Sequence, residues 1–245
     1  MPLTFGSLFA GIGGFDLGFE RAGMVCKWQV EIDEYANRVL VKHWPNVRRW
    51  PDVRTWPQPD TERVDVICGG FPCQDISYAG KGAGIHGERS GLFFEAMRIV
   101  REMGPRVVVL ENVAALLTRG MGDVLGTLAS LGFDAEWGVV PASAFGAPQL
   151  RERVFLLAYT KSQRLEGGCV RRRGVCNAAN YLYGDADSRK DRLPWASWQH
   201  EPSVGRVANG IPCWVDRLRG LGNAVVPQVA EWIGRRIVEA VEAAT

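Results

Sequence analysis

The sequence has no apolar run of the roughly 20 residues that a membrane-spanning helix needs. Its first residues, MPLTF, also lack the positive charge and the following apolar stretch of a secretory signal. Both absences argue against membrane and exported proteins. We therefore expect a soluble protein of the cytoplasm.

The cysteines show no CxxC spacing, which is a common signature of zinc and redox sites. A chain of 245 residues can bury a core large enough to fold without disulfide bonds. We therefore predict no metal site, no disulfide bond, and unpaired thiols without a reactive role at every cysteine except Cys73. The six cysteines are Cys26, Cys68, Cys73, Cys169, Cys176 and Cys213.

Net charge is small, because 29 basic and 27 acidic side chains leave +2. The charge is unevenly distributed: the segment from Thr160 to Leu193 contains eight basic and four acidic residues. Such a basic excess suits contacts with phosphates, and a solvated loop can have the same composition. Charge alone leaves both interpretations open.

Apolar residues alternate between strand-like and helix-like spacing over the first 160 residues. Strands separated by helices predict an α/β fold, a mostly parallel sheet with helices on both faces. The predicted strands are Leu3–Leu8, Val25–Ile32, Val64–Cys68, Arg106–Leu110, Phe133–Val140 and Arg153–Tyr159. The predicted helices are Asp33–His43, Leu92–Met103, Leu125–Leu131 and Val229–Val241, with a further helical stretch after Gly14.

This alternation stops after Tyr159, where Gly, Asn, Asp and Arg replace periodic apolar residues. It resumes after a turn at Gly222-Asn223 with an amphipathic helix, which we expect to pack on the first domain because it has no other surface on which to bury its apolar face. The predicted division is a catalytic and cofactor-binding domain, residues 1–159 and 213–245, with an insert at residues 160–212.

A glycine-rich turn, Phe9-Ala10-Gly11-Ile12-Gly13-Gly14, follows the first predicted strand. Glycines there let a ligand approach the backbone at a helix start. Glu31, at the end of the second strand, is the type of residue that binds a ribose hydroxyl, and Asp52-Val53 can face an adenine edge. Together they predict an adenosine pocket, without distinguishing a redox cofactor from a methyl donor.

Cys73 lies in the turn Gly70-Phe71-Pro72-Cys73-Gln74, just after a buried strand, where α/β proteins place reactive groups. Glu111 closes the neighbouring strand and can exchange a proton there. Residues Gln149, Arg151 and Arg153 are spaced two apart, so on a strand their side chains would share one face toward the same cleft.

These motifs, in this order, resemble those of the DNA (cytosine-5) methyltransferases, above all the short bacterial and phage-encoded enzymes. The resemblance covers the chain except for about Thr160 to Leu193. It implies a Rossmann-like fold that uses S-adenosylmethionine, with a small target-recognition domain. The matching segments are FAGIGG (9–14), EID (31–33), GFPCQ (70–74), ENV (111–113), QxRxR (149–153) and GNAVVP (222–227).

The resemblance also implies the reaction. Cys73 would add to C6 of a flipped-out cytosine in duplex DNA, after which C5 takes the methyl group and S-adenosylhomocysteine is released. Glu111 would hold N3 and Arg153 would contact O2, with Arg151 and Gln149 completing the catalytic set. Arg153 near the thiol would lower the pKa of Cys73.

Other roles follow from the same resemblance. Cofactor binding is assigned to Phe9, Gly11, Ile12, Gly13, Gly14, Glu31, Ile32, Asp52, Val53, Pro72, Leu92, Asn223, Ala224 and Val225. DNA contacts are assigned to Gln74, Ser77, Lys81, Arg89, Arg171, Arg172 and Arg173. Ser7 and Ile32 depart from the family, in which many members have an acid and some an aromatic residue at these two positions.

The expected partner is double-stranded DNA in the nucleoid, and the expected state is a monomer that acts with or without a companion restriction endonuclease. Two alternatives remain: a tRNA cytosine-5 methyltransferase of the same fold, and a catalytically silent DNA-binding relative. A nicotinamide-dependent dehydrogenase would share the adenosine pocket but would leave Cys73 and the QxRxR segment without a role.

Overall fold

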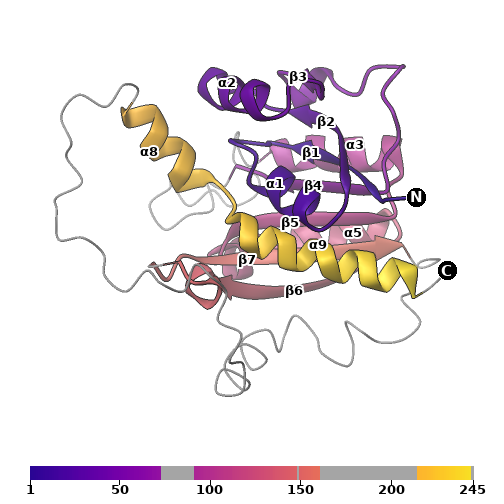
Figure 1. Cartoon of the computed structure of the whole chain (residues 1–245). Coiled ribbons are helices and arrows are strands. Elements are labelled where there is room, and N and C mark those ends of the chain that lie inside the picture. The colour runs from indigo at the N-terminus through magenta and orange to yellow at the C-terminus, as the bar shows by residue number, and fades with distance from the viewer. Residues whose placement is uncertain (73–90, 148, 161–213, 244–245) are drawn as a thin grey trace.

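The computed structural model describes residues 1–72, 91–147, 149–160 and 214–243 (Figure 1). Its strands form one sheet in the order β3-β2-β1-β4-β5-β7-β6. The strands are β1 (Thr4–Leu8), β2 (Val25–Val30), β3 (Arg48–Trp50), β4 (Val66–Gly70), β5 (Val107–Val113), β6 (Phe133–Pro141) and β7 (Glu152–Thr160). The helices are α1 (Gly14–Arg21), α2 (Glu34–His43), α3 (Leu92–Met103), α4 (Leu116–Arg119), α5 (Met121–Ser130), α8 (Trp214–Asn223) and α9 (Pro227–Glu242), with 3-10 turns η1 (Val53–Thr55) and η3 (Ala142–Phe145).

The five strands from β3 to β5 pair in parallel, and β7 and β6 add to β5 in antiparallel. The predicted fold class, a mostly parallel α/β sheet, is confirmed. Antiparallel pairing of β7 places Val113 opposite Arg153 and Glu111 opposite Phe155. The start of β7 therefore lies beside the end of β5.

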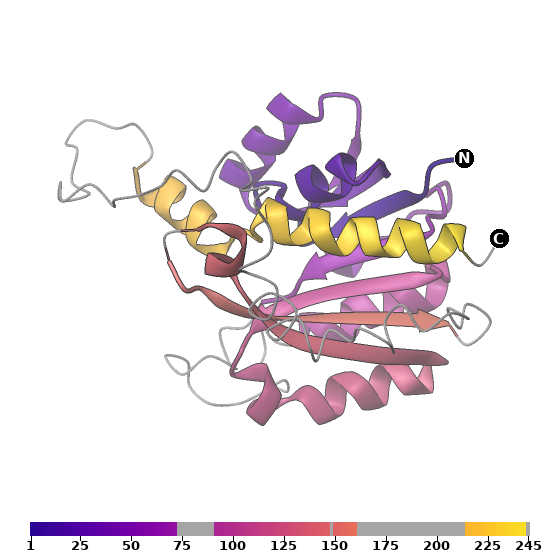
Figure 2. The same cartoon turned by 60° about the horizontal axis from the view of Figure 1, so that its bottom comes forward.

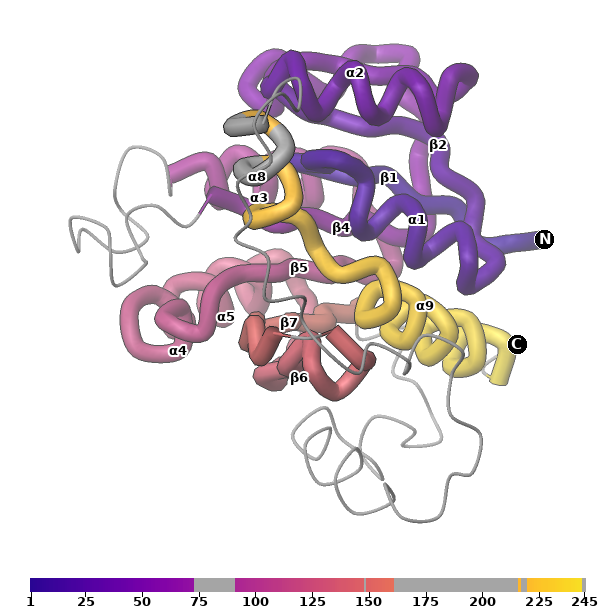
Figure 3. The backbone as a smooth tube through the Cα atoms, turned by 60° about the vertical axis from the view of Figure 1, so that its left-hand side comes forward, coloured from indigo at the N-terminus to yellow at the C-terminus, as the bar shows by residue number. Residues whose placement is uncertain are grey.

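Helices cover both faces of the sheet (Figures 2 and 3). Along β4, Val66 and Cys68 pack with α1 and α9, whereas Ile67 packs with α3 and α5 on the opposite face. This alternation follows from the two-residue period of a strand. It explains why β4 is apolar at every position before its glycines, since both of its faces are buried.

The last helix, α9, packs against α1 near the start of the chain, as the sequence predicts. Helices α1 and α9 approach closely because small residues face each other between them. A Cβ added at Gly18 would lie 2.4 Å from the Cβ of Ala230, and one at Gly234 would lie 2.8 Å from the Cβ of Ala22. Ile233 and Ile237 of α9 are consequently buried.

Local sequence signals account for several helix ends. The carboxylate of Asp33 accepts a hydrogen bond from the Ala36 amide at 2.9 Å and caps α2. Gly104 ends α3 with a positive φ of 60°. Pro227 occupies the first turn of α9, where its missing amide proton costs nothing.

Some predicted element boundaries are wrong. The strand predicted to reach Ile32 ends at Val30, and Ile32 beyond it is 67% exposed. The turn predicted at Gly222-Asn223 is the last part of α8. The sequence does not predict β3, because Arg48–Trp50 is short and contains two arginines instead of an apolar alternation.

Candidate functional site

A cavity of about 570 Å³ lies at the carboxyl ends of the parallel strands, where open α/β sheets bind their ligands. Its size is that of a site for a cofactor or other small molecule. The predicted residues that line it are Phe9, Gly11, Ile12, Glu31, Ile32, Asp52, Val53, Pro72, Leu92, Glu111, Arg153, Asn223 and Ala224.

The glycine-rich turn serves two purposes. A Cβ on Gly11, where φ is +56°, would meet no atom within 4 Å, so this glycine leaves the backbone open toward the cavity. A Cβ on Gly13 would lie 2.4 Å from the Trp44 ring, and one on Gly14 would lie 2.3 Å from the Val225 carbonyl oxygen. Gly13, Gly14 and Val225, which the resemblance assigns to the cofactor, do not line the cavity and instead allow close packing behind it.

Glu31 lines the cavity after β2, and its carboxylate is held by the backbone. Oε2 accepts a hydrogen bond from the Gly11 amide at 2.7 Å, and Oε1 accepts one from the Asp33 amide at 2.8 Å. Burial raises the pKa of Glu31, and the two amides oppose that rise. The side chain is therefore fixed in place with acceptor capacity left on each oxygen for a hydroxyl group.

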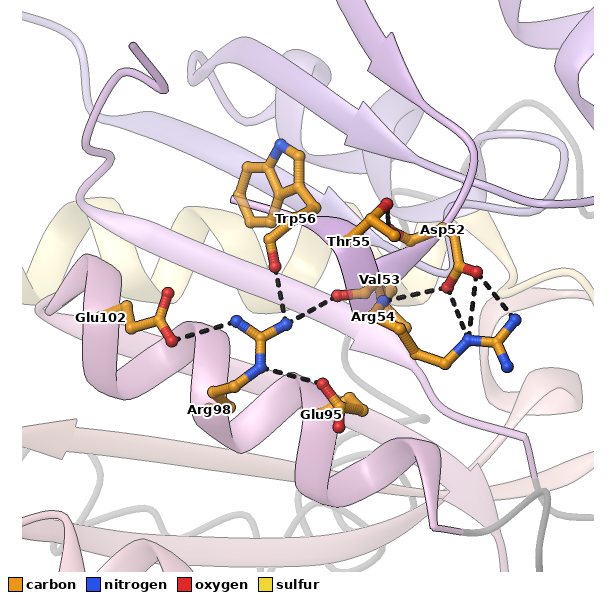
Figure 4. Close-up of polar contacts among 8 residues, drawn as sticks. All are labelled: Asp52, Val53, Arg54, Thr55, Trp56, Glu95, Arg98 and Glu102. Carbon is orange, nitrogen blue, oxygen red and sulfur yellow. Dashed lines mark hydrogen bonds and ion pairs between the residues drawn. The ribbon is translucent and has the colours of Figure 1, made fainter. Parts of the chain in front are cut away.

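The carboxylate of Asp52 is engaged by Arg54, a residue that the sequence interpretation did not include (Figure 4). Arg54 Nη2 donates to Asp52 Oδ2 at 2.7 Å, and the Arg54 backbone amide donates to Oδ1 at 2.9 Å. These hydrogen bonds hold the pKa of Asp52 below its usual value. Arg54 also lines the cavity, so the site presents a cation beside the predicted adenine-binding acid.

Glu111 and Arg153 form an ion pair at the other end of the cavity, with Arg153 Nε 3.2 Å from Glu111 Oε1. The pair forms because β7 runs antiparallel to β5. Glu111 is only 7% exposed, and burial raises its pKa to about 7 against the opposing charges of Arg153 and Arg151. A carboxyl with this pKa can donate or accept a proton near neutral pH.

The expectation that Gln149, Arg151 and Arg153 share one strand face is wrong. The strand β7 begins at Glu152, and Arg151 before it has a φ of +30°. This bend turns the Arg151 guanidinium to the carbonyl oxygens of Gly222 and Ala224, each at 2.7 Å. Gln149 is exposed and does not line the cavity.

Several lining residues lack any sequence signal that would single them out, among them Tyr35, Asp216 and Gly220. Asn112, which also lines the cavity, belongs to the ENV segment. Its Nδ2 donates to the Phe71 carbonyl oxygen at 3.2 Å and so ties β5 to the turn that leads to Cys73.

Other predicted site residues lie outside the described residues, together with the insert after Thr160. They are Cys73, Gln74, Ser77, Lys81, Arg89, Arg171, Arg172 and Arg173. Their roles stay predictions. Cys26 and Cys68, within the described part, are free and buried.

The described ranges contain no group of three or more His, Cys, Asp or Glu side chains placed to hold a metal ion. No helix among them has the length and apolar character of a membrane span.

Residues 3–191 match the family of C-5 cytosine-specific DNA methylases. Among curated proteins, the chain is 37% identical to the type II methyltransferase M.BsuFI of Bacillus subtilis over 163 residues, which is 65% of this chain and 40% of that protein. It is 34% identical to M.HhaI of Haemophilus parahaemolyticus over 168 residues, 67% of this chain and 51% of that protein. The chain thus spans about half, or less, of the length of these relatives.

Solved structures show the same fold. A protein encoded within an Escherichia coli prophage and assigned as a DNA modification methyltransferase superposes with a TM-score of 0.57 and 28% identity, over 67% of this chain and 48% of that one. Dnmt2 methyltransferase of S. pombe gives a TM-score of 0.54 over 64% of this chain and 51% of that one, at 20% identity.

Proposed function

The chain belongs to the C-5 cytosine-specific DNA methylase family, and on that premise we propose that it transfers a methyl group from S-adenosylmethionine to C5 of a cytosine in duplex DNA. One observation carries this proposal. Glu31, an acid of the type that binds a ribose, and the buried Glu111–Arg153 pair line the same cavity.

The described residues fit S-adenosylmethionine, which supplies an electrophilic methyl group when bound. Glu31 offers fixed carboxylate oxygens to the ribose hydroxyls, as in other nucleoside sites of this architecture. Apolar side chains at Phe9, Ile12 and Leu92 line the walls of the same cavity and can cover the flat faces of a nucleoside.

Glu111 is proposed to bind N3 of the cytosine and to donate a proton there. Its raised pKa leaves a substantial protonated fraction near neutral pH, which a surface glutamate would not have. Arg153 carries a permanent positive charge beside Glu111 and would balance the charge that develops at O2 of the base.

Cys73 directly follows Pro72, which lines the cavity. We assign its thiolate the addition to C6, which makes C5 nucleophilic as N3 accepts the proton from Glu111. After methyl transfer, which leaves S-adenosylhomocysteine, the C5 proton is lost to solvent, the bond between sulfur and C6 breaks, and N3 returns its proton to Glu111. The aromatic ring, the free thiolate and the carboxylic acid are thereby restored. Because stacking hides C6, the base has to leave the duplex first.

Residues 160–212 are proposed to recognise the DNA target. The local basic excess supports this, as does the designation of the relatives as type II methyltransferases. The predicted contacts of Arg171, Arg172 and Arg173 would then lie on the phosphate backbone.

The proposal is tested by transfer of a labelled methyl group to duplex DNA of mixed sequence and, separately, to tRNA. The wild-type protein should label the DNA, Cys73→Ser should not, and Cys26→Ser, remote from the cavity, should behave as wild type. Labelling of tRNA alone would show that the substrate is RNA and not DNA. Absence of labelling in both substrates would refute the enzymatic function.

A further inference from the structure

Arg98 of α3 binds the backbone of η1 and of the residue that follows it (Figure 4). Its Nη2 donates to the carbonyl oxygen of Val53 at 2.9 Å and to that of Trp56 at 2.7 Å. Arg98 itself does not line the cavity, whereas Asp52 and Val53 do. The guanidinium therefore connects α3 to η1 and the residues on either side of it.

Two carboxylates hold the guanidinium in this orientation. Arg98 Nε donates to Glu95 Oε2 at 2.9 Å, and Nη1 donates to Glu102 Oε1 at 3.0 Å. All three nitrogens of the planar group thus have partners, and the plane is fixed relative to the helix. The shape of η1 consequently depends on a side chain that lies 45 residues further along the chain.

The order of the strands indicates which end of the ligand η1 faces. Glu111 is on β5 and Pro72 follows β4, so the reacting groups lie toward that side of the sheet. Glu31 follows β2, and η1 comes after the outermost parallel strand, β3. The cavity thus extends from Glu111 and Pro72, past Glu31, to η1. The base of the nucleoside would lie beside η1, and its ribose beside Glu31.

We propose that Arg98 is a positioning residue, which holds η1 in the shape that receives the nucleoside end of S-adenosylmethionine. This inference rests on the proposed function. The guanidinium satisfies two carbonyl oxygens at once, and no aliphatic side chain can replace it. Without it, η1 and the attached Asp52–Arg54 pair lose their polar contacts with α3 and keep only the apolar packing of Val53 and Trp56.

The test compares the affinities of purified variants for two probes by isothermal titration calorimetry. S-adenosylhomocysteine contains the nucleoside and the amino acid, whereas 5′-methylthioadenosine contains the nucleoside without the amino acid. Arg98→Met should raise the dissociation constants of both probes by the same factor, about tenfold for the loss of charge-assisted hydrogen bonds. The kcat at saturating cofactor should stay near the wild-type value.

Two matched controls separate positioning from general destabilisation. Arg235→Met removes an arginine that pairs with Glu231 on α9 and also donates to the Arg21 carbonyl oxygen, away from the cavity. Glu102→Gln removes the negative charge of one partner of Arg98 and leaves both carbonyl contacts. Both controls should bind the two probes as the wild type does.

Wild-type affinity of Arg98→Met for 5′-methylthioadenosine would overturn the inference, as would a loss confined to S-adenosylhomocysteine. If Arg98→Met does not fold, the same affinities are measured for Arg98→Lys, because a lysine cannot bind both carbonyl oxygens as the guanidinium does. Unchanged affinity of the Arg98→Lys variant for both probes would also overturn it. Failure of the wild type to bind S-adenosylhomocysteine would instead count against the proposed function.

Discussion

At the scale of single residues, burial raises the pKa values of Glu111 and Asp16, two acids that lie in different surroundings. Glu111 faces the cavity beside Arg153, and burial outweighs the favourable charge. Asp16 is completely buried in α1, where Gln29 and Ser7 donate hydrogen bonds to it, and burial raises its pKa to about 6. The first acid is available to a ligand, whereas the second is enclosed by the protein.

Replacement of Glu111 by Gln should lower kcat by roughly two to four orders of magnitude, the usual contribution of a general acid. Because the pKa of Glu111 is about 7, the wild-type rate should also decline as pH rises through 7 and the proton is lost. The variant should lack that decline. A pH–rate profile at saturating substrates measures both effects, and an identical alkaline decline in the variant would exclude Glu111 as the proton donor.

Replacement of Asp16 by Asn should stabilise the protein above pH 6. A folded-state pKa of about 6, against a reference value of 3.8, means that ionised Asp16 costs the folded state about 3 kcal/mol. That cost disappears from the wild type as pH falls from 6 toward 4, since Asp16 then becomes protonated. The advantage of the variant should therefore be about 1–3 kcal/mol at pH 7.5 and shrink toward pH 4. Urea unfolding at both pH values measures it, and a stabilisation independent of pH would contradict this assignment.

At the scale of elements, close helix packing on one face of the sheet depends on glycine. The helix α1 contacts α9 through Gly18 and Val225 through its first residue, Gly14, and the turn before α1 contacts Trp44 through Gly13. These contacts bring the carboxyl-terminal helices against the start of the chain. Ala224 and Asn223, just before α9, thereby reach the cavity.

Gly18→Ala should destabilise the protein by about 1–3 kcal/mol, because the added methyl group overlaps Ala230 and the Pro227 carbonyl oxygen. The control is Gly126→Ala in the middle of α5, where a Cβ meets no atom within 4 Å. That variant should be more stable than wild type by about 0.5–1 kcal/mol, the helix preference for alanine over glycine. Equal effects of the two substitutions in urea unfolding would contradict the packing argument.

At the scale of the whole molecule, the cavity is assembled from segments far apart in sequence. The loops after β1, β2, β3 and β4 meet the end of β5, and α8 closes the site from the other end of the chain. Arg151 is the clearest link between these parts, since it precedes β7 and bonds to carbonyl oxygens 71 and 73 residues later.

Arg151→Lys should therefore weaken cofactor binding more than chemistry. A lysine cannot hold both carbonyl oxygens, so Asn223 and Ala224 would lose their support while a positive charge remains near Glu111. We expect an increase of about tenfold in the KM for S-adenosylmethionine with a much smaller change in kcat. A fall in kcat at unchanged KM would instead indicate that Arg151 acts on the cytosine.

Much of this organisation follows from local sequence. Periodic apolar residues determine the strands and helices of the α/β fold, and α3 has the predicted bounds, Leu92–Met103. Glu31 directly follows β2, and Glu111 lies near the end of β5, so their arrival at one edge of a parallel sheet follows from the topology. Asp52 follows β3, a strand that the sequence does not predict.

Only the tertiary structure decided the rest, because it depends on contacts between distant segments. The antiparallel register of β7 brings Arg153 to Glu111, and a bend before that strand turns Arg151 away to α8. The carbonyl contacts of Arg98 and the packing of Gly13 depend equally on elements that are not neighbours in sequence. Sequence periodicity reports which face of an element is apolar, and it carries no information about which distant partner that face meets.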